Sequence, residues 1–94
     1  MLSKEQIRFL KSKSNGLKAT IIVGKEGIAH NLVENIKKDL EAHELVKIDI
    51  LKTADVDLES LPLDLAGQTG SYLISKVGHT IVLFKDSKKH LYLK

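Results

Sequence analysis

The chain has 94 residues, of which 43% are hydrophobic and 29% charged, and it contains no cysteine. These values fit one small globular domain and exclude a disulfide framework and thiolate chemistry. No apolar stretch approaches the roughly 20 residues that a membrane-spanning helix needs, and the amino terminus lacks the apolar core of a signal peptide. We therefore expect a cytoplasmic protein without a membrane partner.

The net charge of +3 is unevenly distributed along the chain. Residues 1–25 carry six Lys or Arg against one Glu, and residues 67–94 carry five Lys against one Asp. Residues 26–66 carry four Lys against ten Asp or Glu. If the two ends of the chain meet in the fold, the protein has a basic face and an acidic one. A basic face of this density favours a polyanion, most simply nucleic acid, over lysines kept only for solubility.

The first predicted element is a helix over residues 3–14. Ser3 and Gln6 fit a capping box at its start, and Asn15-Gly16 predicts an end at a left-handed residue. One side of this helix is apolar and packs against the core. A separate basic stripe has the i, i+4, i+7 spacing and can lie along a nucleic-acid backbone; it comprises Lys4, Arg8 and Lys11.

A glycine loop follows the first predicted strand, which covers residues 18–23. The loop is Gly24-Lys25-Glu26-Gly27, and an amphipathic helix from Ile28 to about His43 comes directly after it. Glycines lack a Cβ and allow a partner to approach closely, while a helix start presents unpaired N–H groups and positive dipole. Together with the charge of Lys25, these features predict a phosphate-binding site. The alternative is a tight strand-to-helix turn that binds nothing.

The rest of the chain predicts three more strands and one more helix. The helix begins near Ser60, because Pro62 is tolerated only in a first turn, and Gly70 ends it. Gly78-His79 predicts a two-residue hairpin loop. The strands cover residues 45–52, 72–77 and 80–84, and residues 86–94 form either an edge strand or a frayed tail.

This order, α-β-α-β-α-β-β, predicts a two-layer α/β fold. Strands that alternate with helices indicate crossovers on one side of a four-stranded mixed sheet. We expect a single domain over residues 1–94, with a core at about residues 2–85.

Three separated blocks of the sequence resemble a known family. They are the segment IIVGKEGI at residues 21–28, the segment HELVKIDIL at residues 43–51, and Thr69-Gly70 followed by SYLISKVGHTIVLFK. Preceded by a basic helix, they resemble a CRM domain (chloroplast RNA splicing and ribosome maturation) in its bacterial stand-alone YhbY-like form. The resemblance covers about residues 2–85.

The resemblance implies an RNA-binding protein that acts on ribosomal RNA in a precursor of the large subunit. It also implies a fold similar to the C-terminal domain of bacterial translation initiation factor three. The family's GxxG loop falls on Gly24, Lys25, Glu26 and Gly27, and its basic helix on Lys4, Arg8 and Lys11. A basic residue after the last strand corresponds to Lys85, which lacks the planar fork of the family's frequent Arg. The helix, the loop and Lys85 are expected to form one positive surface.

Other candidate sites in the sequence are weaker. The second GxxG, Gly67–Gly70, ends a helix and faces its negative pole, so we interpret Gly70 as a helix cap. The four histidines lack metal-ligand spacing, and no cofactor, small-molecule substrate or catalytic arrangement is expected. Lys18 and Lys76 are weaker RNA-binding candidates, since their direction depends on strand register. The alternative function is a protein–protein interaction module that uses the segregated basic and acidic faces.

Overall fold

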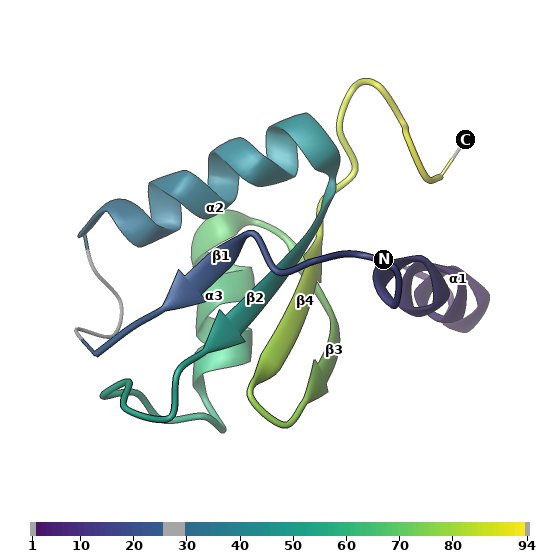
Figure 1. Cartoon of the computed structure of the whole chain (residues 1–94). Helices are drawn as coiled ribbons and strands as arrows, with labels where there is room; N and C mark the ends of the chain where they lie inside the picture. Colours follow the sequence, from purple (N-terminus) through teal and green to yellow (C-terminus); the bar gives the residue numbers. More distant parts are fainter. Residues whose placement is uncertain (1, 26–29, 94) are drawn as a thin grey trace.

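The computed structural model describes residues 2–25 and 30–93. Its helices and strands follow in the predicted order, and Figure 1 shows their arrangement. They are α1 (Lys4–Ser14), β1 (Ile21–Val23), α2 (His30–His43), β2 (Leu45–Ile50), α3 (Leu61–Thr69), β3 (Tyr72–Val77) and β4 (Thr80–Phe84). The predicted α/β fold is therefore confirmed.

The four strands form a mixed sheet with the order β1-β2-β4-β3. β1 pairs with β2 in parallel, whereas β4 pairs antiparallel with both β2 and β3. Two strands are shorter than predicted. β1 begins only at Ile21, where its ladder with β2 starts, and β2 ends at Ile50, since the chain turns soon after Leu51 with Ala54 N–H donating to Leu51 O at 3.0 Å.

The main core lies between the sheet and the two crossover helices. Alternate residues of β2, namely Val46, Ile48 and Ile50, point into it, as the period-2 pattern predicted. α2 and α3 supply the opposite wall through residues such as Ile36 and Leu65, both fully buried. α2 and α3 therefore cover one face of the sheet, as the predicted crossovers require.

Helix α1 packs on the other face of the sheet (Figure 1). A second cluster joins Leu10 of α1 to Leu45, Val82 and Phe84, which alternate with the main-core residues of β2 and β4. Lys47 also lies on this face, and its Nζ donates to Ser14 O at 3.5 Å and Leu17 O at 3.3 Å. The sheet therefore buries apolar surface on both sides, and α1 adds a third layer that the predicted two-layer arrangement did not include.

The end of α1 differs from the prediction. Asn15 caps the helix with φ −61°, in the ordinary helical region and not the left-handed one. The chain leaves the helix through an ordinary turn, in which Leu17 N–H donates to Ser14 O at 3.0 Å, so this carbonyl is satisfied without a left-handed residue. The predicted start is correct, because Ser3 and Gln6 form the capping box through bonds of 2.8 and 3.1 Å.

The carboxyl-terminal tail, residues 86–93, adopts neither of the two predicted forms. It contains no strand, and Figure 1 shows it running past the end of α2. Its backbone and side chains are instead tied to Glu44 at the junction of α2 and β2.

Candidate nucleic-acid interface

The basic stripe of α1 faces solvent. Its three cations, Lys4, Arg8 and Lys11, are all exposed, while Leu10 and Ser14 on the packing side are buried. Within the described residues the ion pairs are Lys37–Glu34 and His90–Asp86, so no described carboxylate forms an ion pair with the stripe. Lys13 extends the charge, with its Nζ 5.5 Å from the ring centroid of Phe9. The stripe can therefore bind an external anion without first breaking an ion pair to a described carboxylate.

The first half of the glycine loop lies at the end of β1. Lys25 is exposed, and a Cβ added to Gly24 would meet nothing within 4 Å. Gly24 also lacks a positive φ, so neither contacts with the described residues nor its own backbone conformation require glycine at this position. Glu26 and Gly27 lie outside the described residues, and α2 is described from His30 onward. A phosphate site built from this loop therefore stays a prediction.

Lys85 lies far from this loop. It follows β4, and its N–H donates to Glu44 O at 2.9 Å, next to the Leu45–Phe84 pair that opens β2. Gly24 follows Val23, which pairs with Ile50 at the other end of β2. Ile50 lies five residue steps along the strand from Leu45, which amounts to about 17 Å. The loop and Lys85 therefore lie at opposite ends of β2, and a positive surface that joins them must span the length of this strand.

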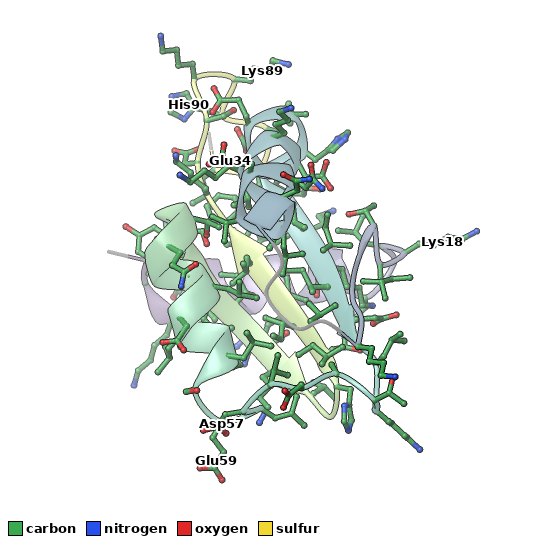
Figure 2. The ribbon with its side chains drawn as sticks, turned by 90° about the vertical axis from the view of Figure 1, so that its left-hand side faces the viewer. Lys18, Glu34, Asp57, Glu59, Lys89 and His90 are labelled. Carbon is green, nitrogen blue, oxygen red and sulfur yellow. The ribbon has the colours of Figure 1, made fainter. Side chains whose placement is uncertain are left out.

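Acidic side chains gather at the loop end of the sheet. The segment that follows β2 carries Asp55, Asp57 and Glu59, and Figure 2 places Asp57 and Glu59 at the opposite end of the molecule from Lys89 and His90. This segment leaves β2 beside the end of β1 and packs on the main core, whereas α1 lies on the other face of the sheet, so the segment's negative charge opposes an anion near Lys25 more than one on α1. The negative charge of the acidic segment therefore weakens anion binding less at the stripe of α1 than at the loop.

Glu44 is a buried charged residue with a structural role that the sequence did not predict. It ends α2 in the left-handed conformation, with φ +67°, and its side chain is fully buried. One carboxylate oxygen accepts from the N–H of Ser87 at 3.0 Å and from its hydroxyl, and the other accepts from Leu91 N–H at 2.9 Å and Tyr92 N–H at 3.4 Å. No local pattern in the sequence signals these contacts, because the partners lie more than 40 residues away.

These contacts set the ionisation of Glu44. Burial disfavours the charged carboxylate and by itself raises the pKa, but the hydrogen bonds from Ser87, Leu91 and Tyr92 outweigh it. The pKa of Glu44 therefore lies below its ordinary value, and the residue is ionised at neutral pH. A buried anion thus holds the tail against the body of the domain.

The second GxxG behaves as predicted. Gly70 has φ +67° and caps α3, and its N–H donates to the carbonyls of Ala66 and Gly67. Among the described residues, no three His, Asp or Glu side chains gather closely enough to hold a metal ion. No helix in the described part of the chain is long and apolar enough to cross a membrane.

The comparisons with known proteins agree with this architecture. The chain is 38% identical over 90 residues to the "Probable RNA-binding protein YqeI" of Bacillus subtilis, covering 96% of this chain and 94% of that protein. It is 27% identical over 84 residues to the chloroplastic CRS2-associated factor 1 of Zea mays, of which it covers 12%. The solution structure of the hypothetical protein SAV1595 from Staphylococcus aureus superposes with a TM-score of 0.78, at 33% identity over 94% of this chain and 92% of that one.

A family model, described as the CRS1 / YhbY (CRM) domain, matches residues 2–85. The match includes all seven helices and strands and leaves out the tail that Glu44 holds. The chain belongs to the CRM domain family.

Proposed function

We propose that this protein binds structured RNA in the cytoplasm, through the basic stripe of α1 together with the Gly24–Gly27 loop, and that it acts by binding and not by catalysis. One observation carries the proposal: Lys4, Arg8 and Lys11 are exposed on the solvent side of a helix whose other side is packed on the sheet. Membership of the CRM family and the names of the relatives support RNA as the polyanion.

Contacts to phosphates fit the surface better than base recognition on the sheet. RNA-binding sheets that read bases do so with exposed aromatic side chains on neighbouring strands. Here Phe84 is buried beneath α1, and Tyr72 is the exposed aromatic of the strands, at 43%. We therefore expect modest sequence selectivity and steep dependence on salt concentration.

The RNA target that we propose is ribosomal RNA in a precursor of the large subunit. The family resemblance supports this choice, whereas the charge of α1 supports only a polyanion. The roles of Gly24, Lys25, Glu26, Gly27 and Lys85 are part of the proposal. Because Lys85 and the loop lie at opposite ends of β2, an RNA that contacts both must extend along the length of this strand.

Charge reversal tests this proposal with a matched control. We expect Arg8→Glu and Lys25→Glu each to weaken binding of a structured ribosomal RNA fragment about threefold or more and to reduce the salt slope by about one, since each removes a phosphate contact. Lys37→Glu makes the same charge change on α2, where Lys37 pairs with Glu34 at 3.7 Å, and should change affinity less than twofold by the same account.

Equal losses in all three variants would mean that net charge alone governs binding, and the interface would be wrong. No RNA binding by the unmodified protein would favour the alternative, in which the basic and acidic surfaces dock another protein. Circular dichroism of each variant verifies that the fold is retained.

A further inference from the structure

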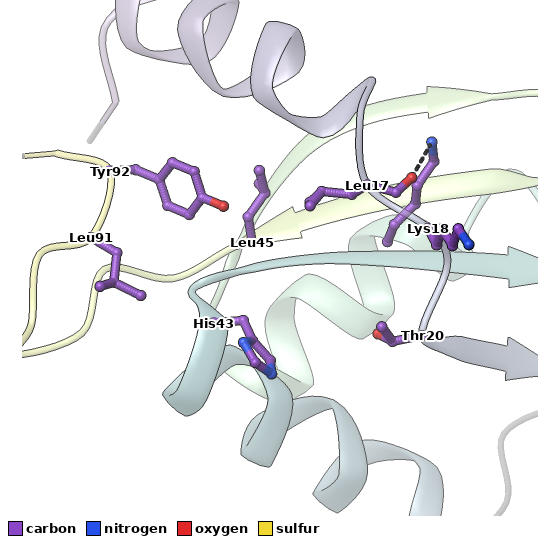
Figure 3. A pocket seen from close by; sticks show the side chains of 8 residues that line it. Leu17, Lys18, Thr20, His43, Leu45, Leu91 and Tyr92 are labelled. Atoms are coloured by element: carbon purple, nitrogen blue, oxygen red, sulfur yellow. Dashed lines mark hydrogen bonds between the residues drawn. The ribbon is translucent and has the colours of Figure 1, made fainter.

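A pocket of about 530 Å³ opens beside the end of α1 (Figure 3). The linker between α1 and β1, the end of α2, the start of β2 and the tail all contribute to its wall. Its lining residues are Leu17, Lys18, Thr20, His43, Leu45, Lys47, Leu91 and Tyr92. The volume falls within the range of about 300–1,000 Å³ that small-molecule sites occupy.

The lining combines an apolar floor with a cationic rim. Leu17, Leu45 and Leu91 supply apolar surface, and Tyr92 directs its hydroxyl toward Leu45 (Figure 3). Two lysines and His43 supply basic groups, and none of the lining residues is acidic. Asp39 lies outside the lining, and its Oδ2 accepts a hydrogen bond from the Thr20 hydroxyl at 3.1 Å.

A ligand that fits this lining carries a compact apolar body and a negative charge. A nucleotide has both, since every base has an apolar π-face and each residue of a strand carries one phosphate. We infer that the pocket receives one unpaired nucleotide of the bound RNA, with the base against Leu17, Leu91 and Tyr92 and its phosphate at Lys18. This inference rests on the proposed function and deepens it.

The position of the pocket supports this occupant. Leu17 and Lys18 follow α1 after a short turn, so a strand whose phosphates run along the stripe reaches the pocket where the helix ends. Figure 2 shows Lys18 projecting from the body of the domain into solvent. Lys47 is already engaged, because its Nζ donates to Ser14 O and Leu17 O, so Lys18 is the lysine of the lining that we assign to the phosphate.

The tail residues that line the pocket are held in place by contacts with the rest of the domain. The Tyr92 ring packs edge-on against Phe84, with centroids 6.4 Å apart and an interplanar angle of 81°. Glu44 accepts hydrogen bonds from the backbone N–H groups of Leu91 and Tyr92. Glu44 is thus a positioning residue, because it holds the two tail side chains that line the pocket.

The test compares RNA duplexes that are identical except at one position. The first is fully paired, the second has one unpaired nucleotide, and the third has an abasic residue in place of that nucleotide. We expect the protein to bind the second about fivefold or more tightly than the other two, because base stacking and burial are available only there.

Two matched variants locate this preference. Leu91→Glu places a carboxylate in the pocket. Leu63→Glu makes the same change at an exposed position of α3, outside the lining. Leu91→Glu should lose the preference for the unpaired nucleotide and retain affinity for the paired duplex within about threefold. Leu63→Glu should keep both properties.

The outcomes separate the inference from the proposed function. Equal affinity of the unmodified protein for the unpaired and abasic duplexes would overturn the inference and leave RNA binding intact. Binding of a free mononucleotide as tight as that of the unpaired duplex would also overturn it, in favour of a small-molecule site. Failure to bind any of the three duplexes would contradict both. The abasic comparison needs no variant and therefore decides the matter even if Leu91→Glu does not fold.

Discussion

At the Ile50 end of β2 a Cβ added to Gly24 would meet no atom of the described residues within 4 Å, whereas at the Leu45 end a buried carboxylate fixes the tail. The first end offers Gly24 and the exposed Lys25 to the outside, without a packing or conformational reason for glycine. The second end satisfies Glu44 entirely from within, through backbone and hydroxyl donors.

This difference shows how to separate residues that hold the fold from residues that meet a partner. Glu44 is explained by its internal contacts, so replacing it should affect stability first. Gly24 has no internal explanation, so replacing it should affect binding first. The predictions below follow this division, from the largest expected effect to the smallest.

Glu44→Gln should cost about 1.5–3 kcal/mol of unfolding free energy at neutral pH, the range for hydrogen bonds to a charged group. An amide keeps only one acceptor oxygen and turns an NH₂ group toward N–H donors, so at least one donor loses its partner. Urea denaturation of both proteins measures the difference. An unchanged midpoint would show that the buried carboxylate contributes nothing to stability.

The same variant predicts a pH dependence with a definite sign. Because the pKa of folded Glu44 lies below its ordinary value of 4.5, the unfolded state binds more protons than the folded one. The carboxylate contributes fully above that ordinary value and loses its contribution as the pH falls through the lower, folded pKa. The gap between wild type and Glu44→Gln should therefore be present at pH 7 and shrink below pH 4.5; a constant gap would contradict the account.

Gly24→Ala is the smallest change and tests the open end of the sheet. Since the added Cβ meets no atom within 4 Å and φ is not positive, stability should change by less than about 1 kcal/mol, with a slight gain. RNA affinity should fall severalfold if the backbone at Gly24 approaches a phosphate. Gly78→Ala is the contrasting control, because its φ of +59° makes alanine strained, and it should lower stability instead.

Local patterns predicted much of the fold. The Ser3–Gln6 capping box, the left-handed Gly70 and the Gly78 turn all depend on residues within a few positions, and each was confirmed. The packing of α1 against the second face of the sheet was not predicted, because the apolar side of a helix does not reveal which surface it covers. The hydrogen bonds between Glu44 and the tail could not be predicted from the sequence either, because the partners of Glu44 are distant in sequence and its left-handed φ occurs without glycine.

The candidate site shows the same limit. The stripe on α1 could be predicted from helical spacing alone, and its exposure agrees. The position of Lys85 relative to the loop could not be predicted, because it depends on the strand order and on the β1–β2 and β2–β4 registers.

The central claim is that the exposed cations of α1 and the loop bind RNA phosphates, and binding of a structured ribosomal RNA fragment across a salt series tests it most directly. Duplex DNA of the same length is the comparator. The account predicts preference for the RNA and an affinity that falls linearly with salt on logarithmic axes, with a slope of about −3 or steeper for at least three to four phosphate contacts. Binding that is independent of salt, or absent at low salt, would contradict it.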